Sequence, residues 1–229
     1  VDEWGVKYSK DGRKLLRVPE ELSGAYSVKE GTRIICDRAF GICRSLSEIV
    51  IPSSVTSIGD SAFSFCDSLS EIVIPSSVTS IGDSVFSFCD SLSEIVIPSS
   101  VTSIGDRAFK DCGSLSTIVI PNSVTSIGDS AFSFCSSLKY ISIPKSVICL
   151  NGNPFAEWNG KLECLSPNYI YEDDILFNKD KSRIISFRNQ NIESYVIPSS
   201  VTSIGDRAFW NCRSLSEIVI PSSVTSIGD

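Results

Sequence analysis

The chain has 229 residues, 42% hydrophobic and 21% charged, a composition typical of a folded protein rather than a disordered one. It contains no histidine, which excludes Ser–His and Cys–His catalytic pairs and imidazole metal sites. The 20 Lys and Arg residues and 27 Asp and Glu residues give a formal net charge of −7, which disfavours nucleic acid and anionic membranes as partners.

The first predicted element is a hairpin near the start of the chain. Residues 6–16 read VKYSKDGRKLL, two apolar runs separated by the turn sequence Lys-Asp-Gly at 10–12. Residues 175–185, ILFNKDKSRII, align with this segment and predict a second hairpin. The second turn lacks the glycine, which weakens its turn signal.

Between and after the hairpins the chain is built from near-identical units. The segment SLSEIVIPSSVTSIGD at 45–60 returns almost unchanged at 68–83, 91–106 and 214–229, with a spacing of 23 residues within the first run. Burying the apolar side chains of one unit gives roughly 10 to 20 kcal/mol, whereas ordering its residues costs about 35 kcal/mol. A single unit therefore cannot fold alone, and we expect the units to stack as a solenoid.

Each unit contains one predicted strand and one predicted turn. The β-branched run Glu48–Ile51, stopped by Pro52, predicts a strand that pairs in parallel with its equivalents in adjacent coils. Gly59 permits a tight corner, and Asp60 is suited to cap a short helical or 3₁₀ turn over 61–66. The same capping role is expected of Asp83, Asp106 and Asp129.

The unit LxxIxIPxSVTSIGxxAFxxCxS resembles the leucine-rich repeats of the BspA-like surface antigens, through Leu46 to Cys135 and again through Tyr195 to Asp229. The two hairpins are similar to the hairpin that recurs in that family. The resemblance implies an α/β-type repeat solenoid, a right-handed leucine-rich repeat superhelix with a parallel β-sheet on its concave face and short helical or 3₁₀ turns and loops elsewhere. It also implies display on, or secretion from, bacteria of mucosal habitats or protozoan parasites, with adhesion as the usual role.

The repeat pattern divides the chain into regular and irregular stretches. We expect a single solenoid over 1–229 that is part of a longer protein, because the chain opens without a start methionine and stops in mid-unit. Its expected parts are a hairpin-bearing irregular coil at 1–28, regular units at 29–144, an irregular coil with a hairpin insert at 145–197 and regular, truncated units at 198–229.

Most of the nine cysteines recur at one position of the unit. Side chains in such a column point the same way into the core, so we expect them to be reduced packing residues rather than disulfides or a zinc site. The column consists of Cys43, Cys66, Cys89, Cys112, Cys135 and Cys212. The redox state of Cys36, Cys149 and Cys164, which lie outside it, stays open.

The outward side of the predicted strand is the candidate recognition face. Alternation along the strand sends Glu48 and Val50 outward, so stacking creates one glutamate row and one valine row. The glutamates either steer basic partners or form a solvated face copied by duplication, and the valine row either binds a partner or reflects β-propensity alone. The candidate binding residues are Glu48, Val50, Glu71, Val73, Glu94, Val96, Thr117, Val119, Tyr140, Glu217 and Val219.

The repeats and rows predict a non-enzymatic binding module with no catalytic residue, metal or cofactor, and the resemblance implies that it is of adhesin type and lies at the cell surface or is secreted. The alternative is a structural spacer array within a larger envelope protein. The expected partner is a protein or other cell-surface macromolecule, with no nucleic acid and no membrane insertion in this segment. End-to-end self-association is also expected, because the last unit leaves strand edges and apolar core uncovered.

Overall fold

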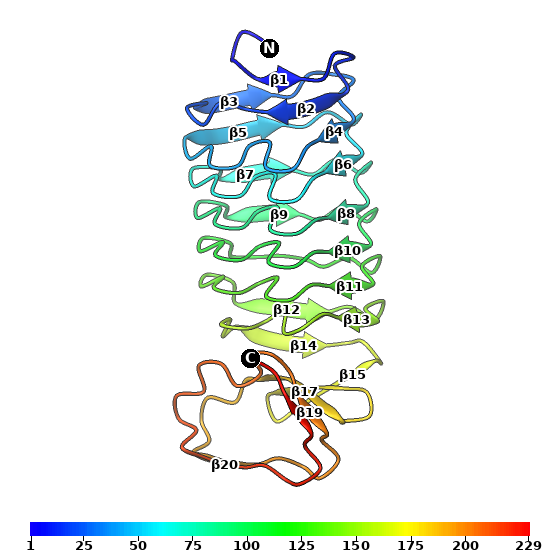
Figure 1. The fold of residues 1–229 in the computed structure, drawn as a ribbon, viewed down its shortest axis with the longest axis vertical. Coiled ribbons are helices and arrows are strands. Elements are labelled where there is room, and N and C mark those ends of the chain that lie inside the picture. Colours follow the sequence, from blue (N-terminus) through cyan, green and yellow to red (C-terminus); the bar gives the residue numbers. More distant parts are fainter.

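The computed structural model describes all 229 residues as a solenoid of stacked coils (Figure 1). Strands of adjacent coils pair in parallel, as predicted, along one row of the solenoid. This first row is formed by β3 (Gly24–Ser27), β5 (Leu46–Val50), β7 (Glu71–Val73) and β9 (Glu94–Val96), followed by the pair β12 (Tyr140–Ile143) and β14 (Lys161–Cys164).

A second row of parallel strands, which the sequence did not predict, runs along another side of the coils. Its members are two residues long and place one isoleucine or leucine of each coil in the core. They are β4 (Ile34–Ile35), β6 (Ser57–Ile58), β8 (Ser80–Ile81), β10 (Ser103–Ile104), β11 (Ser126–Ile127) and β13 (Cys149–Leu150).

Both predicted hairpins are present. β1 (Lys7–Tyr8) pairs antiparallel with β2 (Lys14–Arg17), and β16 (Ile175–Asn178) pairs antiparallel with both β15 (Tyr169–Glu172) and β17 (Arg183–Phe187). The missing glycine of the second turn is replaced by a lysine in the left-handed region, Lys181, with φ 55°. The remaining coils carry β18 (Ser194–Val196), β19 (Ser203–Ile204), β20 (Glu217–Val219) and β21 (Ser226–Ile227).

The predicted helical or 3₁₀ turns are wrong, because the structure contains no helix. In the turn after β6, the backbone N–H groups of Ser61, Phe63 and Phe65 donate to carbonyls of the next coil at 2.8–3.0 Å, rather than within the turn. Ser61 and Phe65 also have φ 55° and 59°, a left-handed conformation that interrupts a right-handed helix. The architecture is therefore a β-solenoid and not an α/β one.

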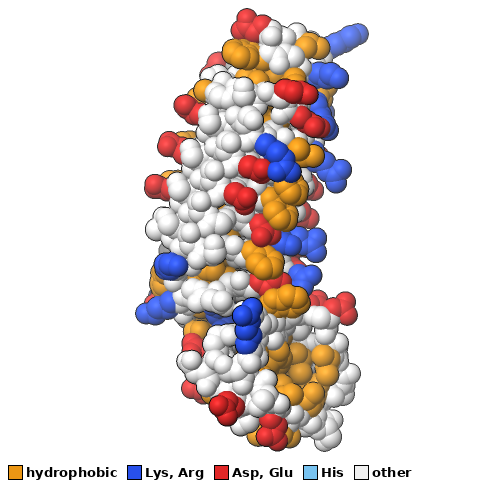
Figure 2. All heavy atoms as spheres, turned by 90° about the vertical axis from the view of Figure 1, so that its left-hand side faces the viewer, with side chains coloured by type: hydrophobic (Ala, Val, Ile, Leu, Met, Phe, Trp, Pro, Cys, Tyr) orange, Lys and Arg blue, Asp and Glu red, His pale blue; other side chains and the backbone are white.

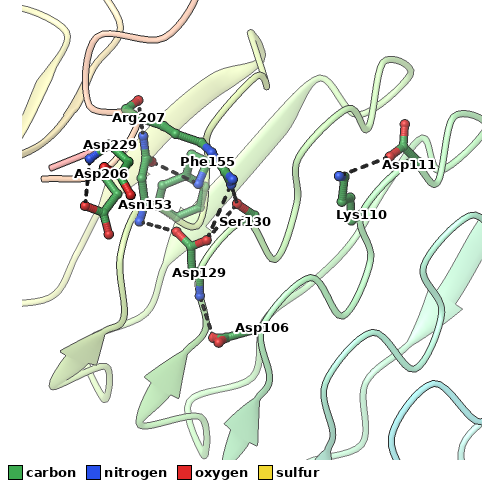
Figure 3. Close-up of polar contacts among 10 residues, drawn as sticks. All are labelled: Asp106, Lys110, Asp111, Asp129, Ser130, Asn153, Phe155, Asp206, Arg207 and Asp229. Carbon is green, nitrogen blue, oxygen red and sulfur yellow. Dashed lines mark hydrogen bonds and ion pairs between the residues drawn. The ribbon is translucent and has the colours of Figure 1, made fainter.

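The predicted capping role of the aspartates is wrong for the same reason. The Oδ1 atom of Asp60 accepts a hydrogen bond from the backbone N–H of Asp83, one coil away, at 2.9 Å. Asp106 and Asp129 continue this aspartate ladder, with bonds of 2.8 Å at each step. Figure 3 shows the step between Asp106 and Asp129. The ladder links coils to one another instead of capping a turn.

The glycine before each ladder aspartate allows the coils to approach closely. A Cβ atom on Gly82 would lie 2.4 Å from Asp60 Oδ1, and one on Gly59 would lie 2.5 Å from the backbone nitrogen of Asp37. Neither glycine has a positive φ. Both are therefore required by the inter-coil contact and not by the corner that the sequence predicted.

The core between the strand rows and the turns is a column of phenylalanine and cysteine side chains. Phe63, Phe86 and Phe109 are fully buried, with ring centroids 5.5–5.7 Å apart in successive coils. The thiol of Cys89 donates to the carbonyl of Phe63 at 3.1 Å, and burial raises the pKa of Cys89 to about 12. The predicted burial of the cysteine column is confirmed for five members: Cys43, Cys66, Cys89, Cys112 and Cys135. Cys212, the sixth, is partly exposed.

The regular stacking of coils is interrupted near residue 153. Asn153 occupies the next position of the aspartate ladder; its backbone N–H binds Asp129 at 2.9 Å, and its side-chain amide donates to the carbonyl of Arg207 at 3.1 Å (Figure 3). Arg207 also donates to Ser130 at 2.8 Å. These bonds hold a C-terminal coil against the main stack. The C-terminal coils have a separate cluster of eight buried hydrophobic residues.

Candidate recognition surface

The glutamate and valine rows form on the outer face of the first strand row. Register pairs Glu71 with Glu94 and Val73 with Val96, so equivalent side chains lie side by side in adjacent coils. The isoleucine between them, Ile72, is 3% exposed, because successive side chains of a strand point to opposite faces. The outward valines are 53–79% exposed: Val50, Val73, Val96 and Val119. The face thus presents an uncovered apolar strip beside an acidic one.

The glutamate row carries uncompensated negative charge. Glu48, Glu71 and Glu94 are exposed, and none forms an ion pair. Adjacent strands of a sheet lie about 4.8 Å apart, and unit charges at that spacing repel by roughly 1 kcal/mol in water. A basic partner would relieve this repulsion, so the row favours binding of cationic groups.

The chemistry of the face changes toward β12 and β14. Thr117 continues the glutamate row through an isolated bridge to Glu94. The next member, Tyr140, is 44% exposed and donates its hydroxyl proton to the carboxylate of Glu163, which also accepts a bond from Ser142 at 2.9 Å. The hydrogen bond from Tyr140 holds the pKa of Glu163 below its ordinary value.

Glu163 was absent from the sequence-based set. It lies in the irregular stretch at 145–197, where the match to the repeat sequence is weak. The 23-residue step from Tyr140 leads to position 163, so the spacing could have found it, and the observed register of β12 with β14, which pairs Ser142 with Glu163, places it on the face.

Two predicted residues lie outside this surface. Glu217 and Val219 are on β20, which pairs only with β18 in a separate two-stranded sheet. Figure 1 shows β20 at the far end of the molecule, beyond the point where the stacking changes. The other predicted residues lie along one face, and Glu217 and Val219 do not extend it. These other residues are Glu48, Val50, Glu71, Val73, Glu94, Val96, Thr117, Val119 and Tyr140.

The structure has no cluster of three or more metal-ligating side chains. It also has no helix with the length and hydropathy needed to cross a bilayer.

The repeats of this chain match a known family of repeat proteins. The family model for the BspA type leucine rich repeat region matches residues 33–161 and 183–229, with six copies. The chain belongs to this family. The resemblance noted from the repeat sequence is therefore confirmed. No curated protein matches the chain.

Solved structures of bacterial proteins are similar to this solenoid. A leucine-rich repeat protein from Eubacterium ventriosum ATCC 27560 has 30% identity and a TM-score of 0.76, over 90% of this chain and 57% of that one. The chain thus spans less than two thirds of that relative. A leucine rich cell surface protein from Faecalibacterium prausnitzii A2-165 has 28% identity and a TM-score of 0.71, over 100% of this chain and 72% of that one. The pneumococcal vaccine antigen PcpA has 23% identity and a TM-score of 0.72, over 94% of this chain and 59% of that one, and shares the fold.

Proposed function

We propose that the chain is a non-enzymatic, protein-binding module of an adhesin, displayed at the cell surface or secreted, and that it binds through the outer face of β5, β7 and β9. The observation that carries this proposal is the uncovered valine row, with Val73 and Val96 67% and 65% exposed beside unpaired glutamates. A contiguous exposed apolar strip is uncommon on a folded monomer and often marks an interaction site.

The partner that fits this face is a protein surface with apolar and basic groups side by side. Apolar contact with the valines supplies affinity, while Lys or Arg side chains of the partner neutralise the glutamate row and speed association. The face is rigid, since each strand is bonded to its neighbours, so little conformational entropy is lost on binding.

The non-enzymatic part of the proposal is supported by the repetition. The coils of β5, β7 and β9 offer the same outward Glu and Val side chains, so this part of the face presents rows and not one singular constellation of acid, base and nucleophile. Leucine-rich repeat solenoids are typically binding scaffolds. The cell-surface assignment rests on the similar protein from Faecalibacterium prausnitzii, which is described as a cell surface protein.

A triple variant tests the proposal: Val73→Thr, Val96→Thr and Glu94→Gln. Threonine keeps the β-branched shape, and Thr117 already occupies the outer face. Losing two apolar contacts is expected to weaken binding to host cells or extracellular matrix by about tenfold or more.

The control is Ile148→Thr with Glu30→Gln, because both residues are exposed and lie away from the face. Threonine is the natural residue one coil earlier, at Thr125. If the triple variant keeps its melting temperature and binds as well as the control, the strand face is not the binding surface, and the spacer function is favoured.

A further inference from the structure

The turns of the coils form a second surface, separate from the strand face. Here a groove of about 550 Å³ runs across several coils and is lined by five Arg or Lys side chains and by no acidic one. Figure 2 shows hydrophobic side chains in a row along this side of the solenoid, with both basic and acidic side chains beside them. The positive lining contrasts with the net charge of −7 of the whole chain.

The apolar part of the groove consists of Ile42 and two phenylalanines, all with the backbone in a strained conformation. Phe65 and Phe88 stack with ring centroids 4.4 Å apart and have φ 59° and 62°. Bulky side chains rarely adopt positive φ, which costs of order 1–3 kcal/mol. Folding does not require phenylalanine at this position of the coil, because Asp111 and Asn211 occupy it with φ 58° and 60°. The partly exposed rings are therefore candidates for a binding role.

Two of the cations in the groove have no partner. Arg38 and Arg107 are exposed and form no ion pair, whereas Arg17 and Arg207 lie 3.2 and 3.7 Å from carboxylates. Lys110 lies 4.0 Å from the carboxylate of Asp111 (Figure 3). Arg38 and Arg107 are thus the groups most able to bind an external anion.

The distance between these two arginines indicates how far apart two anionic groups of a ligand must lie. They are three coils apart, which is about 14 Å at the spacing of adjacent strands. An extended peptide advances about 3.4 Å per residue and alternates its side chains, so residues i and i+4 point the same way about 14 Å apart, with i+2 between them. The phenylalanines Phe65 and Phe88 lie in the two coils between the arginines.

We propose that this groove binds an extended acidic peptide with two carboxylates four residues apart and an apolar side chain midway between them. The carboxylates bind Arg38 and Arg107, and the apolar side chain packs on Phe65 and Phe88. Serine hydroxyls that line the groove, such as those of Ser64 and Ser84, are available to the peptide backbone.

Fluorescence anisotropy with the labelled peptide GSETFTESG at low ionic strength tests the proposal. The double variant Arg38→Ser and Arg107→Ser is expected to weaken binding about tenfold or more, since hydrogen bonds between charged groups are among the strongest in proteins. Serine occupies the same position of the coil at Ser61 and Ser84, so this variant is expected to fold.

The matched control is Lys139→Ser with Lys145→Ser, which changes the net charge equally outside the groove and is expected to bind like the wild type. Phe88→Asn is expected to weaken binding of GSETFTESG but not of GSETSTESG, in which serine replaces the central apolar residue. Asparagine is natural at the equivalent Asn211.

Three results would overturn the proposal: no binding of GSETFTESG to the wild type, equal affinity for the neutral peptide GSQTFTQSG, or equal weakening by the lysine control. Heparin provides the comparison with a polyanion that is not a peptide. If heparin binds in a manner dependent on Arg38 and Arg107 and GSETFTESG does not bind, the groove is a polyanion site and the peptide proposal fails.

Discussion

Replacement of Gly105 by alanine is expected to disrupt the contact between two coils. The backbone N–H of Gly105 donates to the carbonyl of Ile81 at 2.8 Å, and the adjacent Asp106 N–H donates to Asp83 Oδ1 at 2.8 Å. A Cβ atom on Gly105 would lie 2.5 Å from Asp83 Oδ1, 2.6 Å from the carbonyl carbon of Gly82 and 2.7 Å from the backbone nitrogen of Asp83. Because two of these atoms are backbone, a side-chain rotation cannot relieve the clash.

The expected loss of stability has two sources. Forcing one extra carbon into a packed contact costs about 1–3 kcal/mol. Displacing the Asp83 carboxylate from the Asp106 N–H removes a hydrogen bond to a charged group, which contributes about 1.5–3 kcal/mol. We therefore expect Gly105→Ala to lower the free energy of unfolding by about 2.5–6 kcal/mol. In a solenoid this loss of stability corresponds to a weaker interaction between neighbouring coils.

Gly113→Ala is the matched control for the glycine experiment. A Cβ atom on Gly113 would have Ser136 Oγ as its nearest neighbour, at 3.9 Å, which is ordinary contact. Serine occupies the equivalent position at Ser136. This variant is expected to change the free energy of unfolding by less than about 0.5 kcal/mol.

Urea unfolding followed by circular dichroism measures both variants, and the midpoint and slope are compared because repeat proteins can depart from two-state behaviour. If Gly105→Ala unfolds at the same urea concentration as Gly113→Ala, the glycines do not set the distance between coils, and the reasoning from the aspartate ladder is refuted.

Three further predictions concern titration, reactivity and association. Tyr140→Phe is expected to remove a stabilising hydrogen bond to Glu163. The stabilisation is present above the ordinary Glu pKa of 4.5 and is lost as pH falls through the lowered pKa of Glu163. The melting temperatures of the wild type and of Tyr140→Phe should therefore converge at low pH. Under native conditions N-ethylmaleimide should modify the exposed Cys149 rapidly and leave the buried Cys89, whose pKa is raised to about 12, unmodified, as mass spectrometry of peptides would detect. The 229-residue chain should associate in sedimentation experiments, because Ile220 is 47% exposed, and a monomer at high concentration would contradict this.

The stacking and the outer strand were predictable from sequence because both depend on local signals that recur. A β-branched run ended by Pro52 predicts a strand, and a fixed spacing of 23 residues places its copies in adjacent coils. The hairpin at 10–12 was predictable from its Asp-Gly turn, and Gly12 has φ 71°.

The remaining features depend on contacts between coils, which no local pattern reveals. The two-residue strand at Ser57–Ile58 is too short to show alternation. The sequence Asp-Ser-Ala-Phe after Gly59 matches a helix start, but the N–H groups of Ser61 and Phe63 bond to the next coil, so the turn stays non-helical. Glu217 could not be separated from the main glutamate row, because its unit has the same sequence as the others and only the docking of the last coils places it elsewhere.

The most direct test of the register that creates the recognition face uses the absence of histidine from the chain. In the variant Glu71→His with Glu94→His, the two imidazoles would lie on paired positions about 4.8 Å apart and chelate one Zn²⁺ ion. Zn²⁺ is expected to raise the melting temperature of this variant, because a metal that binds only the folded state stabilises it, and to have little effect on Glu48→His with Glu94→His, which are two coils apart. An equal response of the two variants, or no response of either, would contradict the in-register stacking of the glutamate row.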